Sequence, residues 1–151
     1  MDEGSVIVGV GNPMRGDDAV GPAVAAGLRA LVPHGVRVVQ CEGEPTALMD
    51  AWAGARRVIL VDAVTSAAPP GSVVRMEASE EGLPARLFAR STHLVGIAEA
   101  IELARALGTL PEQVVVYGVE AGTFVPGEAL SPQVAHAVEV VTDRILAELH
   151  A

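Results

Sequence analysis

The architecture of this chain is set by its opening segment, Val6-Ile7-Val8-Gly9-Val10-Gly11-Asn12-Pro13-Met14-Arg15-Gly16-Asp17-Asp18-Ala19-Val20-Gly21. The apolar run at its start predicts a β-strand, and the alanine-rich stretch that follows predicts a helix. A glycine-rich loop between a strand and a helix usually binds phosphate through backbone N–H groups. This loop instead carries two adjacent carboxylates, Asp17 and Asp18, which repel phosphate and attract cations or hold protons. It therefore indicates metal or acid–base chemistry rather than nucleotide binding.

Strand and helix patterns alternate along the rest of the chain, whereas the segment Glu77–Arg90 has no clear pattern. We expect strands over Ser5–Val10, Val36–Gln40, Arg57–Val61 and Val114–Val119, and an edge strand over Ser72–Met76. Helices are expected over Asp18–Leu31 and Pro45–Ala53, after the caps Ser91-Thr92 with apolar residues from Leu94 to Leu107, and from Ser131-Pro132 onward. This order is typical of one doubly wound α/β domain over residues 1–151. The predicted fold has three layers, with a mostly parallel central sheet and helices on both faces.

Composition narrows the class of protein further. Half of the 151 residues are apolar but only 3% are aromatic, so the core must consist of valine, alanine, leucine and isoleucine. No apolar run is long enough to span a bilayer, and the acidic N-terminus lacks the features of a signal peptide. Cys41 is the only cysteine, which excludes an internal disulfide and a cysteine-based metal cluster. We therefore expect a soluble, cytoplasmic protein.

Charge excludes some partners and mechanisms. The formal net charge of −9 argues against nucleic acid and anionic membranes, which favour dense lysine and arginine. All ten basic residues are arginine, so no mechanism that requires a lysine is available to this chain.

Three side chains are candidates for catalysis and metal contact: Asp18, Asp62 and His93. In a doubly wound sheet, ligands bind beyond the carboxyl ends of the strands, where the strand order reverses. We expect the strand order to reverse between the first and third strands. Asp18 follows the first strand, Asp62 ends the third, and His93 begins a helix at the same edge of the sheet. Two carboxylates and one imidazole leave open coordination positions for water or substrate, as in a metal-assisted hydrolase.

Each candidate also has a simpler structural interpretation. Asp17 or Asp18 would cap the first helix, Asp62 would close a turn at a strand end, and His93 would be an ordinary first-turn residue. Three further acids near predicted strand ends are candidates to line the cleft: Glu42, Glu44 and Glu120.

Other classes of protein share parts of this pattern. Gly9 and Gly11 match half of a dinucleotide fingerprint, but Met14 stands where the third glycine belongs. A phosphorylated receiver domain has an acidic pair after its first strand and an aspartate after its third, but it also uses a lysine that this chain lacks. A non-catalytic nickel-binding metallochaperone or sensor would use the same three ligands without hydrolysis.

Four segments, in this order and at these separations, resemble the hydrogenase maturation endopeptidases. They are Val8–Gly21, Leu60-Val61-Asp62-Ala63-Val64, Ser91-Thr92-His93-Leu94-Val95-Gly96-Ile97, and Tyr117-Gly118-Val119-Glu120 with Leu130–Val134. Members of that family remove a C-terminal extension from the large subunit of nickel–iron hydrogenases.

The resemblance implies a site, a metal and a partner. It places the metal-contacting acid of the family on Asp18, its second acid on Asp62 and its histidine on His93, with roles in both metal contact and catalysis. The metal implied is nickel carried by the large-subunit precursor, and other divalent ions would occupy the site in vitro. We expect a monomer with that precursor as its partner. Two mechanisms remain open: metal-assisted hydrolysis, and an aspartic-type pair of Asp17 or Asp18 with Asp62.

Overall fold

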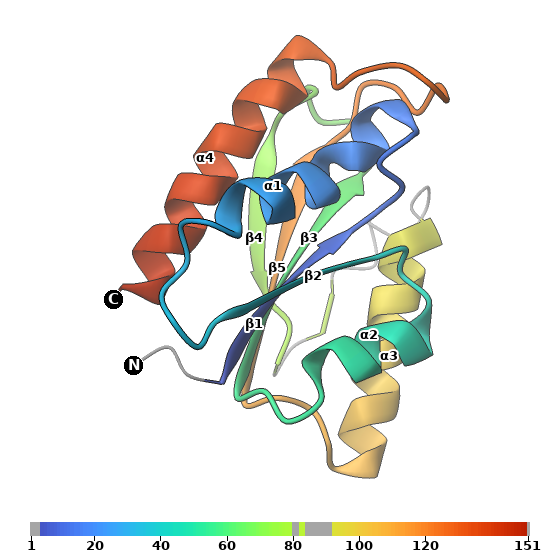
Figure 1. Cartoon of the computed structure of the whole chain (residues 1–151). Coiled ribbons are helices and arrows are strands. Elements are labelled where there is room, and N and C mark those ends of the chain that lie inside the picture. Colours follow the sequence, from blue (N-terminus) through green and yellow to red (C-terminus); the bar gives the residue numbers. More distant parts are fainter. Residues whose placement is uncertain (1–3, 80–81, 84–91, 151) are drawn as a thin grey trace.

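Five strands form one sheet in the order β2-β1-β3-β5-β4 (Figure 1). The computed structural model describes residues 4–79, 82–83 and 92–150, without the side chains of Thr92 and His93. The strands are β1 Ser5–Val10, β2 Arg37–Cys41, β3 Arg57–Val64, β4 Val73–Glu77 and β5 Gln113–Glu120. The helices are the 3-10 helix η1 Gly16–Ala19, α1 Val20–Leu28, α2 Pro45–Trp52, α3 Thr92–Leu107 and α4 Pro132–Leu149.

The strand order confirms the predicted doubly wound fold. β1 pairs in parallel with β2 on one side and with β3 on the other, so the strand order reverses between β1 and β3. β5 continues the parallel sheet, and β4 is an antiparallel edge strand, at the place where the sequence predicts one. The carboxyl ends of β1, β2, β3 and β5 therefore lie along one edge of the sheet, which we call the carboxyl edge.

Helices cover both faces of the sheet, with α1 and α4 on one side and α2 and α3 on the other (Figure 1). Alternate strand residues point to opposite faces: in β3, Leu60 and Val64 pack toward α2 and α3, whereas Ile59 and Val61 pack toward α1 and α4. Asp62 is two residues after Leu60 on the same strand, so it belongs to the same face of the sheet, the one covered by α2 and α3. No helix among the described residues is long and apolar enough to cross a membrane.

Close packing holds α1 against the sheet. A Cβ on Gly21 would lie 2.3 Å from the carbonyl oxygen of Val10 and 2.5 Å from that of Val61. Only a residue without a side chain permits this contact, because real Cβ atoms do not approach backbone oxygens so closely. Gly21 thus fixes the start of α1 directly above β1 and β3.

Several boundaries differ from the sequence-based expectation. The first helix is shorter than Asp18–Leu31, because Asp18 lies in η1 and regular α1 runs only from Val20 to Leu28. The third strand continues to Val64, because its pairing with β5 extends as far as Glu120. Asp62 therefore lies inside a strand, paired with Gly118, and not at a strand end. Most of Glu77–Arg90, for which the sequence has no pattern, lies outside the described residues.

Candidate active site at the carboxyl edge

The loop after β1 folds back over Asp18. Gly11 has a φ of +139°, and a Cβ there would lie 2.1 Å from the backbone oxygen of Asp18. The next residue, Asn12, donates its backbone N–H to Oδ2 of Asp18 at 2.9 Å. Its own side-chain oxygen accepts a bond from the Met14 N–H at 2.8 Å, which closes the turn. The glycine-rich segment thus holds a carboxylate by its backbone instead of a phosphate.

Neither carboxylate of the acidic pair caps a helix. The N-cap of α1 is Ala19 and that of η1 is Arg15, and neither helix start receives a side-chain cap bond. Asp18 is nevertheless only 2% exposed. The capping interpretation of Asp17 and Asp18 is therefore wrong.

Asp62 lies on β3 at the same edge and is fully buried. The first residues of α1 and the η1 turn contact β3, which brings the segment that carries Asp18 against the strand that carries Asp62. The charge of Asp62 also reaches Cys41 at the end of β2. Burial is the main cause that raises the pKa of the Cys41 thiol, and the negative charges of Asp62 and Glu44 add to it. Residues of η1, β2 and β3 therefore lie near one another at the carboxyl edge.

His93 is the second residue of α3, and its side chain lies outside the described part of the structure. The backbone places it well: a Cβ on Gly96, one turn further along α3, would lie 2.1 Å from the carbonyl oxygen of Gly43. Gly43 follows β2, so the first turn of α3 lies against the end of that strand (Figure 1). This is the same face and edge of the sheet to which Asp62 belongs.

No group of three histidine, cysteine, aspartate or glutamate side chains within the described set is arranged to hold a metal ion. That set includes Asp18 and Asp62 but not the imidazole of His93. Asp18, Asp62 and the backbone of His93 all lie at the carboxyl edge. That their three side chains hold one metal ion stays a prediction.

Asp17 has a structural role that its neighbour does not share. It is fully buried, and its carboxylate accepts bonds from the backbone N–H groups of Gly122, Thr123 and Ser131 at 2.7, 3.0 and 2.7 Å. The hydroxyl of Ser131 also donates to it, at 2.8 Å to Oδ2. Ser131 is the N-cap of α4 but makes no capping bond with its side chain. Asp17 thus ties η1 to the loop between β5 and α4.

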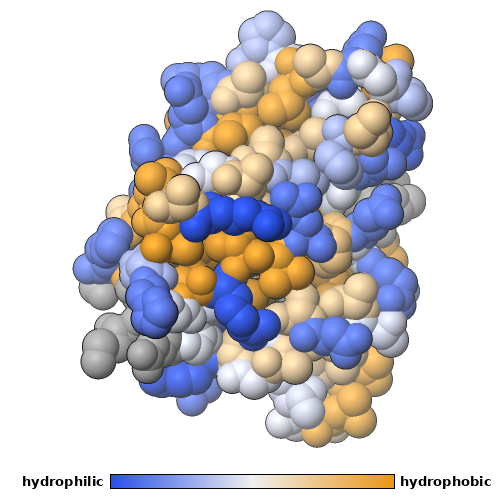
Figure 2. Space-filling view, viewed as in Figure 1, coloured by the Kyte–Doolittle hydropathy of each residue, from blue (hydrophilic) through white to orange (hydrophobic). Residues whose placement is uncertain are grey.

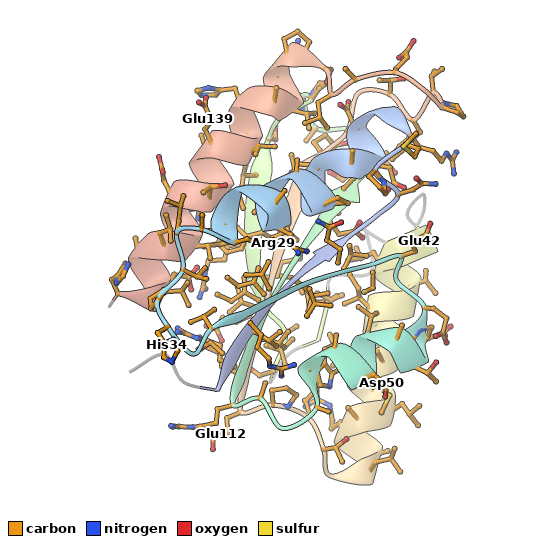
Figure 3. All side chains as sticks on the ribbon, in the orientation of Figure 1. Arg29, His34, Glu42, Asp50, Glu112 and Glu139 are labelled. Carbon is orange, nitrogen blue, oxygen red and sulfur yellow. The ribbon has the colours of Figure 1, made fainter. Side chains whose placement is uncertain are left out.

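The three further acids have separate roles. Glu120, only 4% exposed, accepts bonds from the N–H and the hydroxyl of Ser66 in the loop after β3. Glu44 caps α2 by accepting bonds from the N–H groups of Thr46 and Ala47. The hydrogen bond from the Thr46 hydroxyl is the main cause that lowers the pKa of Glu44, and the two N–H bonds add to it. Glu42 is exposed at the end of β2, close to the first turn of α3 (Figure 3).

A cleft of about 560 Å³ opens between the loop after β1 and the end of β2. Its lining comprises Gly11, Asn12, Pro13, Gln40, Cys41, Glu42, Glu44 and Ala47. Gly11 and Asn12 contact Asp18, so one wall of the cleft lies next to this buried carboxylate. Glu42 and Glu44 are expected at such a cleft from their places near predicted strand ends, whereas no sequence signal points to Gln40.

The sequence pattern of the hydrogenase maturation protease family matches residues 24–148, which is most of the chain. The chain belongs to this family. It is therefore a peptidase, and family membership decides against the dinucleotide-binding, receiver and non-catalytic metal-carrier interpretations. The matched range begins after the loop that carries Asp18, so the family match does not include that loop.

Individual members of the family agree with this assignment. The hydrogenase 2 maturation protease of Escherichia coli K12 is 28% identical over 149 residues, which are 95% of this chain and 89% of that protein. The structure of the hydrogenase maturating endopeptidase HybD from E. coli matches with a TM-score of 0.82 at 26% identity, covering 97% of this chain and 91% of its own. The HybD protease of Thermococcus kodakarensis, at 24% identity and a TM-score of 0.77 over 93% of this chain and 95% of its own, supports the same fold.

Proposed function

We propose that this peptidase removes the C-terminal extension of a nickel–iron hydrogenase large-subunit precursor after nickel has been inserted. The observation that carries the proposal is that two buried carboxylates lie on contacting segments at one edge of the sheet. Asp18 comes from η1 and Asp62 from β3, and the first turn of α3 brings His93 to the same edge. In this proposal the nickel belongs to the substrate, and Asp18, Asp62 and His93 recognise it.

The environment of these residues favours a cation. A divalent ion is attracted more strongly to carboxylates in a buried, low-dielectric site than in water. His93 lies in the first turn of α3, where the partial positive charge of the helix end disfavours the imidazolium form. A neutral imidazole keeps a lone pair available for a metal. Two carboxylates and one imidazole would leave coordination positions for the ligands that the precursor itself provides.

The same groups can perform peptide hydrolysis. Asp18, Asp62 and His93 would hold a divalent ion that would polarise the scissile carbonyl and lower the pKa of an attacking water, and one of the two carboxylates would take up the proton of that water. The alternative is an aspartic-type pair, in which two carboxylates share one proton. Because the carboxylate of Asp17 is occupied by the loop before α4, such a pair would consist of Asp18 and Asp62.

We also propose that the protein acts as a monomer in the cytoplasm and binds its precursor transiently. With a net charge of −9, the chain lacks the dense lysine and arginine that would attract nucleic acid. We therefore propose the precursor as its macromolecular partner.

The test mixes the purified protein with nickel-loaded and nickel-free forms of its precursor and follows the shift in precursor mobility. We expect cleavage of the loaded form alone. Asp62→Asn and His93→Ala should each abolish cleavage. The control is Asp50→Asn, which changes an exposed aspartate on α2 (Figure 3) and should leave cleavage unchanged. Equal cleavage of both precursors would overturn nickel recognition. Nickel binding without cleavage of either precursor would indicate a metal carrier and overturn the processing role.

A further inference from the structure

β2 leaves one side of its backbone open, next to the candidate site. It is the last strand of the sheet and pairs only with β1 among the described residues. Its residues are partly or fully exposed, with Arg37 and Gln40 the most exposed, whereas every residue of β1 is buried. Exposed strand edges can pair with another chain.

The phase of the hydrogen bonds shows which backbone groups face outward. Gly11 donates its N–H to the carbonyl oxygen of Cys41 at 3.0 Å. In a parallel ladder, alternate residues of a strand bond to the same neighbour, so Cys41, Val39 and Arg37 bond to β1. The N–H and C=O groups of Val38 and Gln40 therefore point away from the sheet. No other described segment forms a backbone hydrogen bond with these groups.

This open edge runs directly into the cleft. Gln40 and Cys41 are the last residues of β2, and both also line the cleft together with Gly11 and Asn12. Figure 2 views this side of the molecule and shows apolar surface crossed by hydrophilic side chains where β2 passes in Figure 1. The surface suits an extended chain that carries both kinds of side chain.

We propose that the precursor segment beside the scissile bond binds to the outer edge of β2 as an additional strand. This inference rests on the proposed function, because it takes the precursor as the occupant. An extended peptide gains affinity from main-chain hydrogen bonds and exposes its own backbone for cleavage. Such pairing uses the outward groups of Val38 and Gln40 and directs the chain toward Asp18 and Asp62.

The register fixes how the bound chain must continue. Cys41 pairs with Val10, and Gly9 pairs with Val61, so Asp62 is level with Cys41 and two strands away. A strand outside β2 would lie three strand spacings from β3, or about 14 Å. An extended chain covers about 3.3 Å per residue. The scissile bond should therefore lie about four residues beyond the last residue that pairs with β2.

The decisive pair of variants is Gln40→Pro and Gln40→Ala. Proline removes the outward N–H of residue 40 without removing a bond to β1, and edge strands tolerate proline in this orientation. Alanine removes only the side chain. We expect Gln40→Pro to process the nickel-loaded precursor about tenfold more slowly than Gln40→Ala, because alanine keeps the outward N–H of residue 40 and proline does not. Thermal unfolding verifies that both variants are folded.

Processing by Gln40→Pro at the rate of Gln40→Ala would overturn strand addition and leave the proposed function intact. Failure of the wild-type protein to cleave any precursor would instead overturn the proposed function itself. The two failures are therefore distinguishable in one assay.

A second measurement applies if Gln40→Pro does not fold. Synthetic peptides with the sequence around the cleavage site of the precursor, N-methylated at one position at a time, compete with the precursor for the wild-type protein. Strand addition predicts that inhibition is lost at every second position of the paired segment and kept between them. Equal effects at all positions, or no inhibition by the unmodified peptide, would contradict it.

Discussion

The carboxylate of Asp17 accepts hydrogen bonds from both the backbone N–H and the hydroxyl of Ser131, a residue 114 positions later in the chain. Through this contact the loop before α4 is tied to η1, the turn that carries Asp18. A second contact, from the Gly127 N–H to the Met14 carbonyl oxygen at 2.8 Å, joins the loop just before η1 to the same loop before α4. The segment that presents Asp18 is therefore held by residues far from it in sequence.

Asp17→Asn should destabilise the protein by about 2–3 kcal/mol, because the amide NH₂ cannot accept the backbone N–H bonds and leaves buried donors without partners. Chemical denaturation measures the loss. The matched control is Asp50→Asn, in which the aspartate is exposed, and its free energy of unfolding should change by less than about 0.5 kcal/mol. Equal effects of the two variants would contradict a structural role for Asp17.

Gly21→Ala should destabilise the fold by about 3 kcal/mol or more, since the new Cβ would meet the backbone oxygens of Val10 and Val61. Gly27 lies on the same helix, and a Cβ added there would meet no other atom within 4 Å. Gly27→Ala should therefore stabilise the protein, by about 0.5–1 kcal/mol. Thermal unfolding of the two variants compares them directly, and similar melting temperatures would refute the close packing of α1.

Glu120 and Ser66 should behave as a coupled pair. Glu120→Gln and Ser66→Ala each remove bonds that hold the loop after β3, and each should cost about 1–2 kcal/mol of stability. The double variant should lose less than the sum of the two, because the same bonds are removed. Hydrogen exchange at the Ser66 amide should also be faster in Glu120→Gln. Additive losses and unchanged exchange would argue that the pair does not hold this loop.

Much of the fold follows from sequence pattern. The continuous apolar run of β3, Val58–Val61, indicates a central parallel strand, and the order of strands and helices then limits the topology to a doubly wound sheet. That topology is enough to bring Asp18, Asp62 and the start of α3 to one edge. Local signals therefore predict which segments share that edge, because the carboxyl ends of parallel strands lie along one edge of the sheet.

Long-range contacts limited the prediction. Asp17 and Asp18 are adjacent acids with nothing local to separate them, and their different roles depend on partners in different parts of the chain. The side-chain contact between Glu120 and Ser66 joins two strand ends and has no local signature. The cleft residue Gln40 likewise depends on β2 being the edge strand. Ser131 looks like a helix cap by sequence, yet its hydroxyl binds Asp17.

Tyr117, the only tyrosine, should titrate abnormally. Burial raises its pKa to about 12, with a further contribution from its hydrogen bond to Glu148. Because an unfolded tyrosine ionises near about pH 10, the folded state should lose stability as the pH rises from about 10 to about 12. The ultraviolet absorbance of tyrosinate follows this ionisation directly.

The matched variant for that titration is Glu148→Gln, which removes the negative charge beside the Tyr117 hydroxyl. The tyrosine pKa should fall toward its ordinary value, so the loss of stability that begins near about pH 10 should be smaller and should end at lower pH than in the wild-type protein. An ordinary titration of Tyr117 in the folded wild-type protein would contradict the contact with Glu148.

We propose that Asp18, Asp62 and His93 bind one cation together at the carboxyl edge. The anomalous scattering of a crystal of this protein soaked with nickel(II) measures this directly. We expect a single strong peak bonded to one oxygen of each carboxylate and to one nitrogen of the imidazole. A peak at other residues, or side chains of these three too far apart to bond the same ion, would contradict it.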